Sequence, residues 1–156
     1  MFRFLNCVLL GFAPPFPGST FYNYVRDARS GALAEMRAMG FEVDSDIPIA
    51  YEYFPPIPVN AAGVAAKTHL YTSPYMALEC VTIGDTWFEL SMSDRVRVLI
   101  HEFFHVMDHN IIDIAYEYEP TYLNLTEDER WINADSLTEL VMTNARHEVM
   151  KNEVTK

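Results

Sequence analysis

The chain has 156 residues, of which half are hydrophobic and 13% aromatic, so global disorder is excluded and one domain with a hydrophobic core is expected. Acidic residues outnumber basic ones by 22 to 11 and no basic run exists, so we expect no binding to nucleic acid, which requires clustered Lys and Arg. No apolar run approaches the roughly 18 residues needed to span a bilayer, and we expect no membrane partner.

The N-terminal segment allows two interpretations. Arg3 is followed by a short apolar stretch, as in a weak signal peptide, but a buried first strand or helix fits equally well. Cys7 and Cys80 could form one disulfide if the protein is exported, although the sequence does not say whether they meet in space.

The first half of the chain contains one predicted helix and two predicted strands. Apolar residues recur at roughly helical spacing from Ser19 to Met39, and Gly40 is a plausible helix stop. The stretch from Ile47 to Phe54 alternates loosely and predicts a strand, and Met76 to Ile83 predicts a second one. The small residues from Asn60 to Ala66 indicate a loop.

Two further helices are predicted in the second half. Ser91, followed by Asp94, forms the acidic variant of a capping box, and the helix that starts there should run to about residues 109–110. After a loop, a last helix should start at Thr126. Its expected buried face contains Trp131, Ala134, Leu137, Val141 and Ala145.

These elements predict one α+β domain over residues 1–156, mainly helical with a small sheet. Within it, residues 1–18 form the possible signal or N-terminal segment, and residues 151–156 form a flexible polar tail.

The predicted helix after Ser91 carries the motif His101-Glu102-x-x-His105. Two histidines four residues apart project from one helix face, so both rings can reach one tetrahedral zinc ion at about 2.0–2.1 Å. Glu102 lies where a carboxylate takes a proton from the attacking water rather than binding the metal. The alternative is a surface helix with unrelated histidines, but the motif interrupts a strongly apolar helix, where unpaired His and Glu are costly to bury.

A third protein ligand is needed, and several residues are candidates. The metzincin subclass is excluded because position 111, where its third His would stand, is Ile. His109 continues the helical spacing, but one straight helix cannot easily wrap three ligands around one ion. Glu139 on the last helix and Asp113 just after the motif helix are the other candidates. Two further histidines, His69 and His147, have no partners in the sequence and are interpreted as surface residues.

The chain resembles a known family of zinc peptidases, the aspzincins, which include deuterolysin and peptidyl-Lys metalloendopeptidase. The resemblance spans roughly residues 76 to 141 and lies in His101-Glu102-x-x-His105, Asp113-x-x-Tyr116 and Asn133-Ala134-Asp135-Ser136. The chain differs from the family pattern at Ile111, Ile112 and Glu117.

This resemblance implies a zincin-like domain with one zinc ion, for which Asp113 is the third ligand beside the two histidines. It also implies that Tyr116 donates a hydrogen bond to the oxyanion, and that Asp135 supports the site or lines the pocket beside it. Lysine-specific members receive the substrate lysine with acidic residues, and Asp135 and Glu139 could do so here. Aspzincins are mostly secreted, which favours an extracellular location.

The sequence therefore predicts a secreted, monomeric zinc metalloendopeptidase that acts on proteins or peptides, with Glu102 as general base. The first alternative is a catalytically degenerate zincin-like domain that binds a partner through its cleft. The second is a zinc hydrolase with a substrate other than protein.

Overall fold

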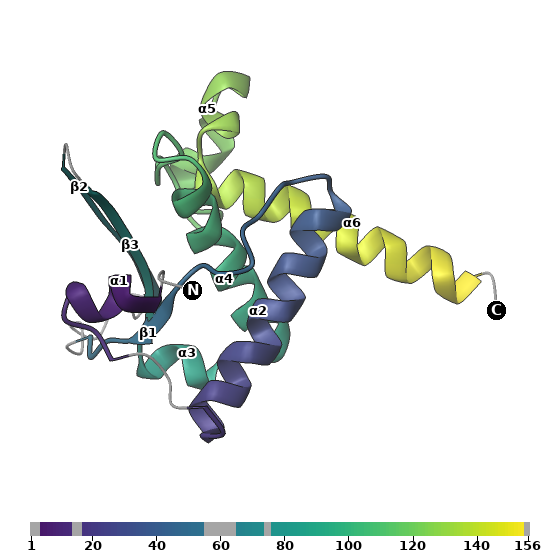
Figure 1. Ribbon diagram of the computed structural model, residues 1–156. Helices are drawn as coiled ribbons and strands as arrows, with labels where there is room; N and C mark the ends of the chain where they lie inside the picture. The colour runs from purple at the N-terminus through teal and green to yellow at the C-terminus, as the bar shows by residue number, and fades with distance from the viewer. Residues whose placement is uncertain (1–3, 14–16, 55–64, 74–75, 155–156) are drawn as a thin grey trace.

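Most of the described helices lie on one side of a small sheet, and α4 (Met92–Met107) is the one that packs most closely against it (Figure 1). The computed structural model describes residues 4–13, 17–54, 65–73 and 76–154. Within these ranges the chain forms one α+β domain with six α-helices and three strands, which confirms the predicted class. The helices are α1 (Phe4–Leu9), α2 (Thr20–Ala38), α3 (Asp85–Glu89), α4 (Met92–Met107), α5 (Glu127–Trp131) and α6 (Ala134–Val154), with a 3-10 helix η1 (Pro120–Asn124). The strands are β1 (Ile49–Tyr51), β2 (Ala66–Ser73) and β3 (Met76–Ile83).

The sheet has the order β1-β3-β2, so β3 is central and β2 lies at an edge. β1 runs parallel to β3, and β2 pairs antiparallel with it over eight residues. The prediction for β3 is confirmed with the same bounds, whereas β1 is shorter than the predicted strand. β2 is a strand that the sequence did not predict, and only residues 65 and 66 of the predicted loop lie within the described ranges.

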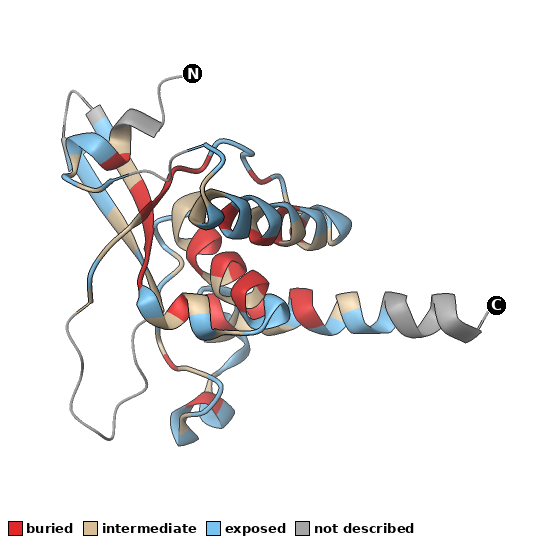
Figure 2. Cartoon of the chain, turned by 90° about the horizontal axis from the view of Figure 1, so that it is seen from below, coloured by how far each residue is buried: buried red, intermediate tan, exposed pale blue. Residues whose placement is uncertain are grey.

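The two faces of the sheet are covered by different helices. Val81 and Ile83 of β3 belong to the main core, which α2, α4 and α6 complete with buried residues where these helices meet (Figure 2). Cys80 directly precedes Val81 in the sequence and faces α1 on the opposite side, because side chains alternate along a strand. There it forms a disulfide with Cys7, so the two cysteines do meet. In the described part of the N-terminal segment, Phe4–Leu9 forms the helix α1.

The helix α4 begins as predicted and ends earlier than predicted. The Ser91 hydroxyl accepts a hydrogen bond from Asp94 N (3.2 Å) and donates one to the Asp94 carboxylate (2.6 Å), which confirms the cap. Asp108 has extended backbone dihedrals, and its side chain accepts a hydrogen bond from Asn110 N (2.9 Å). Such a local Asx turn competes with the helix, so the chain leaves the axis after Met107.

The predicted last helix is two helices, α5 and α6, with a break at Ile132 and Asn133. The prediction that Trp131 lies on a buried face is wrong, because it ends α5 and is 58% exposed. The predicted flexible tail is helical as far as Val154, and the last two residues lie outside the described ranges.

No helix among the described residues is both long enough and apolar enough to cross a bilayer.

Candidate metal centre

The two histidines of the motif lie on the face of α4 that is turned away from the main core. Leu99, Ile100 and Phe103, which lie on the opposite side of the helix, are fully buried in the main core. The imidazoles of His101 and His105 keep 12% and 14% of their side-chain surface exposed. The amphipathic pattern of the helix therefore fixes both rings at the edge of the core.

The loop after α4 brings Asp113 to both rings. Asp113 Oδ1 lies 2.9 Å from His101 Nε2 and 3.1 Å from His105 Nε2, and the two Nε2 atoms lie 3.3 Å apart. In the described part of the chain, this is the one group of three His, Cys, Asp or Glu side chains that could hold a metal ion. Three potential ligand atoms therefore converge on one point.

The spacing of these three atoms fits a zinc ion. Bonds of about 2.0–2.1 Å to a tetrahedral zinc place neighbouring ligand atoms about 3.3 Å apart. The observed separations of 2.9, 3.1 and 3.3 Å are close to that edge length. Two imidazole nitrogens and one carboxylate oxygen also form a donor set that zinc commonly takes.

Each ring has a partner on its other nitrogen. His105 Nδ1 lies 2.8 Å from the carbonyl oxygen of Ile111, which can only accept, so this nitrogen carries a proton. In the neutral ring the lone pair is then on Nε2, which faces Asp113. His101 Nδ1 lies 3.6 Å from Asp135 Oδ1, which directs its Nε2 toward the same point. Such contacts behind a ligand fix its orientation in known metal sites.

The electrostatics of the group favour positive charge where its atoms converge. Burial alone lowers the pKa of His101, but hydrogen bonds with Asp113 and Asp135 and the charge of Glu102 raise this pKa to about 9. Burial acts in the opposite sense on Asp113, but hydrogen bonds with His101 and His105 hold its pKa well below the ordinary range. The carboxylate of Asp113 therefore stays ionised and available to a cation.

Glu102 is buried beside the histidines and held by the edge strand. Its carboxylate Oε2 accepts a hydrogen bond from the Thr68 hydroxyl (2.7 Å), and 7% of its surface is exposed. Desolvation raises the pKa of Glu102, and the charge of His101 and the Thr68 hydrogen bond oppose that shift. A carboxyl group with a raised pKa is better matched to proton transfer near neutral pH than an exposed one.

Tyr116 lies over the converging atoms. Its hydroxyl donates to Asp113 Oδ2 (3.0 Å), and its ring stacks on that of His101 with centroids 5.8 Å apart. Burial, followed by the charge of Asp113, raises the pKa of Tyr116, so the phenol keeps its proton. Its hydroxyl is thus a donor directly beside the candidate ligands.

The loop that carries Asp113 and Tyr116 is shaped by Asn133, a residue for which the sequence predicts no role. The fully buried Asn133 side chain accepts hydrogen bonds from Ile114 N (2.9 Å) and Ala115 N (3.3 Å) and donates to Ala115 O (2.9 Å). These bonds explain why the chain breaks between α5 and α6, because a continuous helix would not turn this side chain toward the loop.

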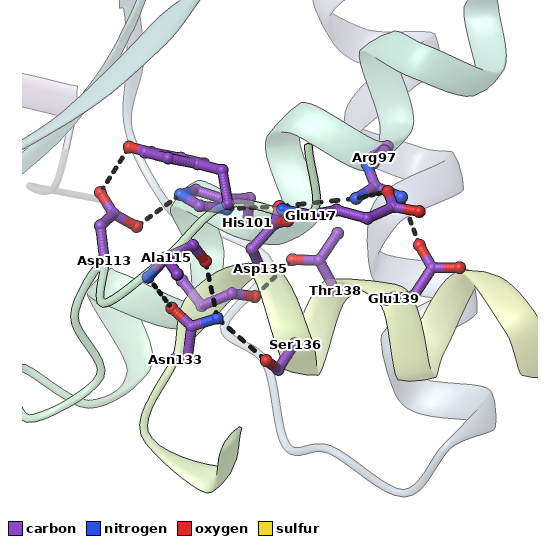
Figure 3. A network of polar contacts seen from close by, with 12 residues as sticks. Arg97, His101, Asp113, Ala115, Glu117, Asn133, Asp135, Ser136, Thr138 and Glu139 are labelled. Carbon is purple, nitrogen blue, oxygen red and sulfur yellow. Dashed lines mark hydrogen bonds and ion pairs between the residues drawn. The ribbon is translucent and has the colours of Figure 1, made fainter. Parts of the chain in front are cut away.

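Asp135 lies behind His101, in a network that reaches Glu139 through Arg97 (Figure 3). Asp135 accepts a hydrogen bond from Glu117 N (2.6 Å) and pairs with Arg97 (3.5 Å). The same guanidinium lies 2.5 Å from Glu139 and 2.9 Å from Glu117. Arg97 was missed, although its place one helical turn before His101 is a signal that it shares the face of that ligand.

An open cleft of about 560 Å³ lies in front of these residues, between β2 and the loop after α4. Its described lining consists of Ala66, Lys67, Thr68, His69, Leu70, Glu102, His105, His109, Ile111, Ile112, Asp113 and Tyr116. Asp135 and Glu139 are not among these residues. His109 lines the cleft from beyond the end of α4, and Asp113, not His109, meets the two histidines.

The interpretation of His69 as an unpartnered surface histidine is wrong. His69 Nε2 lies 2.7 Å from Glu52 Oε2 and 3.1 Å from the buried Thr82 hydroxyl. The register of the β2–β3 pair places His69 opposite Cys80, on the face toward α1. Because β2 was not predicted, this cross-strand contact could not be foreseen. His147 is exposed.

The residues of the candidate metal centre can hold a cation, accept a proton and donate a hydrogen bond at one cleft.

Comparison of the chain with models of protein families, with curated proteins and with solved structures finds no match.

Proposed function

We propose that the chain is a zinc metalloendopeptidase with a zincin-like domain similar to the aspzincins. The observation that carries this proposal is the convergence of His101 Nε2, His105 Nε2 and Asp113 Oδ1 within 3.3 Å of one another. The carbonyl of Ile111 supports it further, because this contact leaves the lone pair of His105 on the converging side.

On this proposal His101, His105 and Asp113 hold one zinc ion. When bound there, zinc supplies Lewis-acid chemistry, lowering the pKa of an attacking water toward about 7 and polarising the scissile carbonyl. Glu102 takes the proton of the water and passes it to the leaving amine. Its raised pKa suits both steps, and the Thr68 hydroxyl fixes the carboxylate.

Tyr116 donates its phenolic hydrogen to the oxyanion that develops on the attacked carbonyl. This role requires a protonated phenol, which agrees with its raised pKa. In the structure the hydroxyl donates to Asp113 Oδ2 (3.0 Å), so a donor is already held beside the candidate ligands.

The edge strand β2 favours a peptide over another kind of substrate. Gly84 N donates to Ala65 O (3.0 Å), and hydrogen-bonded pairs alternate along an antiparallel ladder. The backbone groups of Ala66, Thr68 and Leu70 therefore face the outer edge, with which no described strand pairs. An extended peptide can add to such an edge through main-chain hydrogen bonds, and this edge borders the cleft.

Replacement of Glu102 tests the proposal. We expect Glu102→Gln to retain one zinc per chain but to lose peptide hydrolysis by on the order of 1,000-fold, because the amide cannot act as a base. Elemental analysis and cleavage of a quenched peptide measure the two quantities. Glu127→Gln, at an exposed position in the first turn of α5, is the matched control and should behave as wild type.

The outcomes separate the proposal from the degenerate-domain alternative. If Glu102→Gln hydrolyses the peptide at nearly the wild-type rate, Glu102 is not the general base. A wild-type chain that binds zinc without cleaving any protein or peptide would favour a binding domain or a different hydrolase.

A further inference from the structure

Apolar side chains line the cleft from both β2 and the loop after α4, and we call these two sets its apolar walls. Ala66 and Leu70 line it from β2, and Ile111 and Ile112 line it from the loop after α4. Leu70 is 42% exposed and Ile112 is 49% exposed, although both are large apolar side chains. Exposed apolar side chains that flank convergent polar groups in a cleft are typical of a ligand subsite.

The backbone that carries both apolar walls is held by hydrogen bonds or strand pairing to neighbouring segments. Ile112 N donates to Ile132 O (2.8 Å), and Ile112 O accepts from Ala134 N (3.0 Å), so Ile112 is bonded on both sides. Leu70 pairs with Glu79 of β3 and shares its strand face with Thr68, which contacts Glu102. The two side chains are therefore held in place for an occupant and need little ordering to receive one.

The cleft offers no spare carboxylate for a lysine. Among its described lining residues the acids are Glu102 and Asp113, both already assigned to the reaction. The other ionisable side chains of this lining are Lys67, His69, His105, His109 and Tyr116. None of them is a carboxylate that could pair with an ammonium group.

The two acids that could have received a lysine are engaged elsewhere. Asp135 and Glu139 both pair with Arg97, at 3.5 Å and 2.5 Å. Arg97 keeps 22% of its side-chain surface exposed and pairs with Glu117 as well, so its charge is held within this network. A substrate lysine would therefore have to share Asp135 with the guanidinium that already pairs with it.

We propose that the cleft selects an apolar substrate side chain beside the scissile bond, held between Leu70 and Ile112, and that it disfavours lysine there. This inference rests on the proposed peptidase function and specifies the substrate class of that same site. Leu70 and Ile112 act in it as specificity residues and take no part in the chemistry.

Two series of quenched peptides test the inference with the zinc-loaded wild-type protein. In each series one residue flanking the scissile bond is Leu, Phe, Ala, Lys or Glu, and kcat/KM is measured for every peptide. At one of the two positions we expect Leu or Phe to exceed Lys by tenfold or more, in line with the discrimination that hydrophobic pockets achieve.

Variants locate the subsite. Leu70→Ala and Ile112→Ala should each lower kcat/KM for the Leu and Phe peptides several-fold more than for the Ala peptide, whereas Ile112→Glu should raise the relative rate for Lys. Leu123→Ala is the control, because Leu123 is 80% exposed on η1 and outside the cleft lining. Thermal unfolding of each variant checks that it is folded.

The results distinguish this inference from the proposed function. Chelator-sensitive cleavage with a preference for Lys, or with no preference, would overturn the apolar subsite and leave the peptidase intact. If the protein prefers Leu or Phe and the variants Leu70→Ala and Ile112→Ala keep that preference, these two residues do not form the subsite. If no peptide and no component of a protein mixture is cleaved, the peptidase proposal fails, and the subsite fails with it.

Discussion

A single hydroxyl links the edge strand to the reactive centre. Thr68 donates to the carboxylate of Glu102 (2.7 Å) and also lies 3.1 Å from the backbone carbonyl of the same residue. The contact fixes one rotamer of a buried carboxylate that would otherwise have to find another donor. The same hydrogen bond connects β2, which lines the cleft, to α4, which carries the proposed general base Glu102.

Thr68→Val tests this contact with little change of side-chain volume. We expect kcat to fall about tenfold, because a hydrogen bond to a charged group is worth roughly 1.5–3 kcal/mol and fixes the base. The Thr68 bond lowers the pKa of Glu102, so its loss raises that pKa. A base must be deprotonated to act, and the acidic limb of the pH–rate profile should therefore move to higher pH. If both the pH–rate profile and the zinc content are unchanged, the Thr68 hydroxyl has no role in the reaction and the side chain contributes only packing.

Residues of the site differ in how far the sequence reveals them. His101, Glu102 and His105 follow from spacing within one helix, which needs no tertiary information. Asp113 was one of several candidate ligands until the family resemblance singled it out. Thr68 gave no signal, because its partner is 34 residues away and its strand was not recognised.

At the scale of elements, helices with caps were predictable and irregular junctions were not. The Ser91 cap depends on residues three apart, so local chemistry sets where α4 starts. β2 contains polar and apolar residues without clear alternation. One of its faces meets α4, and on the other the His69 ring contacts Phe12. The break before α6 depends on Asn133, whose partners lie 18 and 19 residues earlier.

Asn133→Ala tests whether this junction supports the metal centre. The variant leaves buried backbone groups of Ile114 and Ala115 without their partner, so we expect the unfolding free energy to fall by about 1–3 kcal/mol. Because the loop also carries Asp113, zinc affinity should fall about 10- to 100-fold, as for other residues that orient ligands. Competition with a zinc indicator measures it, with Asn124→Ala, at an exposed position on η1, as control. If stability falls but zinc affinity does not, Asn133 stabilises the fold without supporting the metal centre.

At the scale of the whole molecule, the disulfide joins parts that are far apart in the sequence. Cys7 and Cys80 are separated by 73 residues, and the bond fastens α1 to β3 on the sheet face opposite α4. Such bonds persist in oxidising compartments. The disulfide is therefore compatible with the extracellular location that the sequence predicts.

Cys7→Ala/Cys80→Ala tests the contribution of this bond. Closing a loop of this length restricts the unfolded chain, so we expect the double variant to lose about 2–4 kcal/mol of unfolding free energy. For a chain of this size, that corresponds to a fall in Tm of roughly 5–15 °C. Peptide cleavage at 25 °C should persist, because α1 and the candidate metal centre lie on opposite faces of the sheet. Loss of cleavage in a folded double variant would show that the two faces are coupled.

The zinc content of the purified chain tests the central proposal most directly. After equilibration with zinc and dialysis, elemental analysis should find one zinc ion per chain in the wild type. Asp113→Ala should lose tightly bound zinc, whereas His109→Ala and Glu139→Gln should keep it, because neither side chain belongs to the converging group. A wild-type chain without zinc, or Asp113→Ala with undiminished zinc, would contradict the proposal.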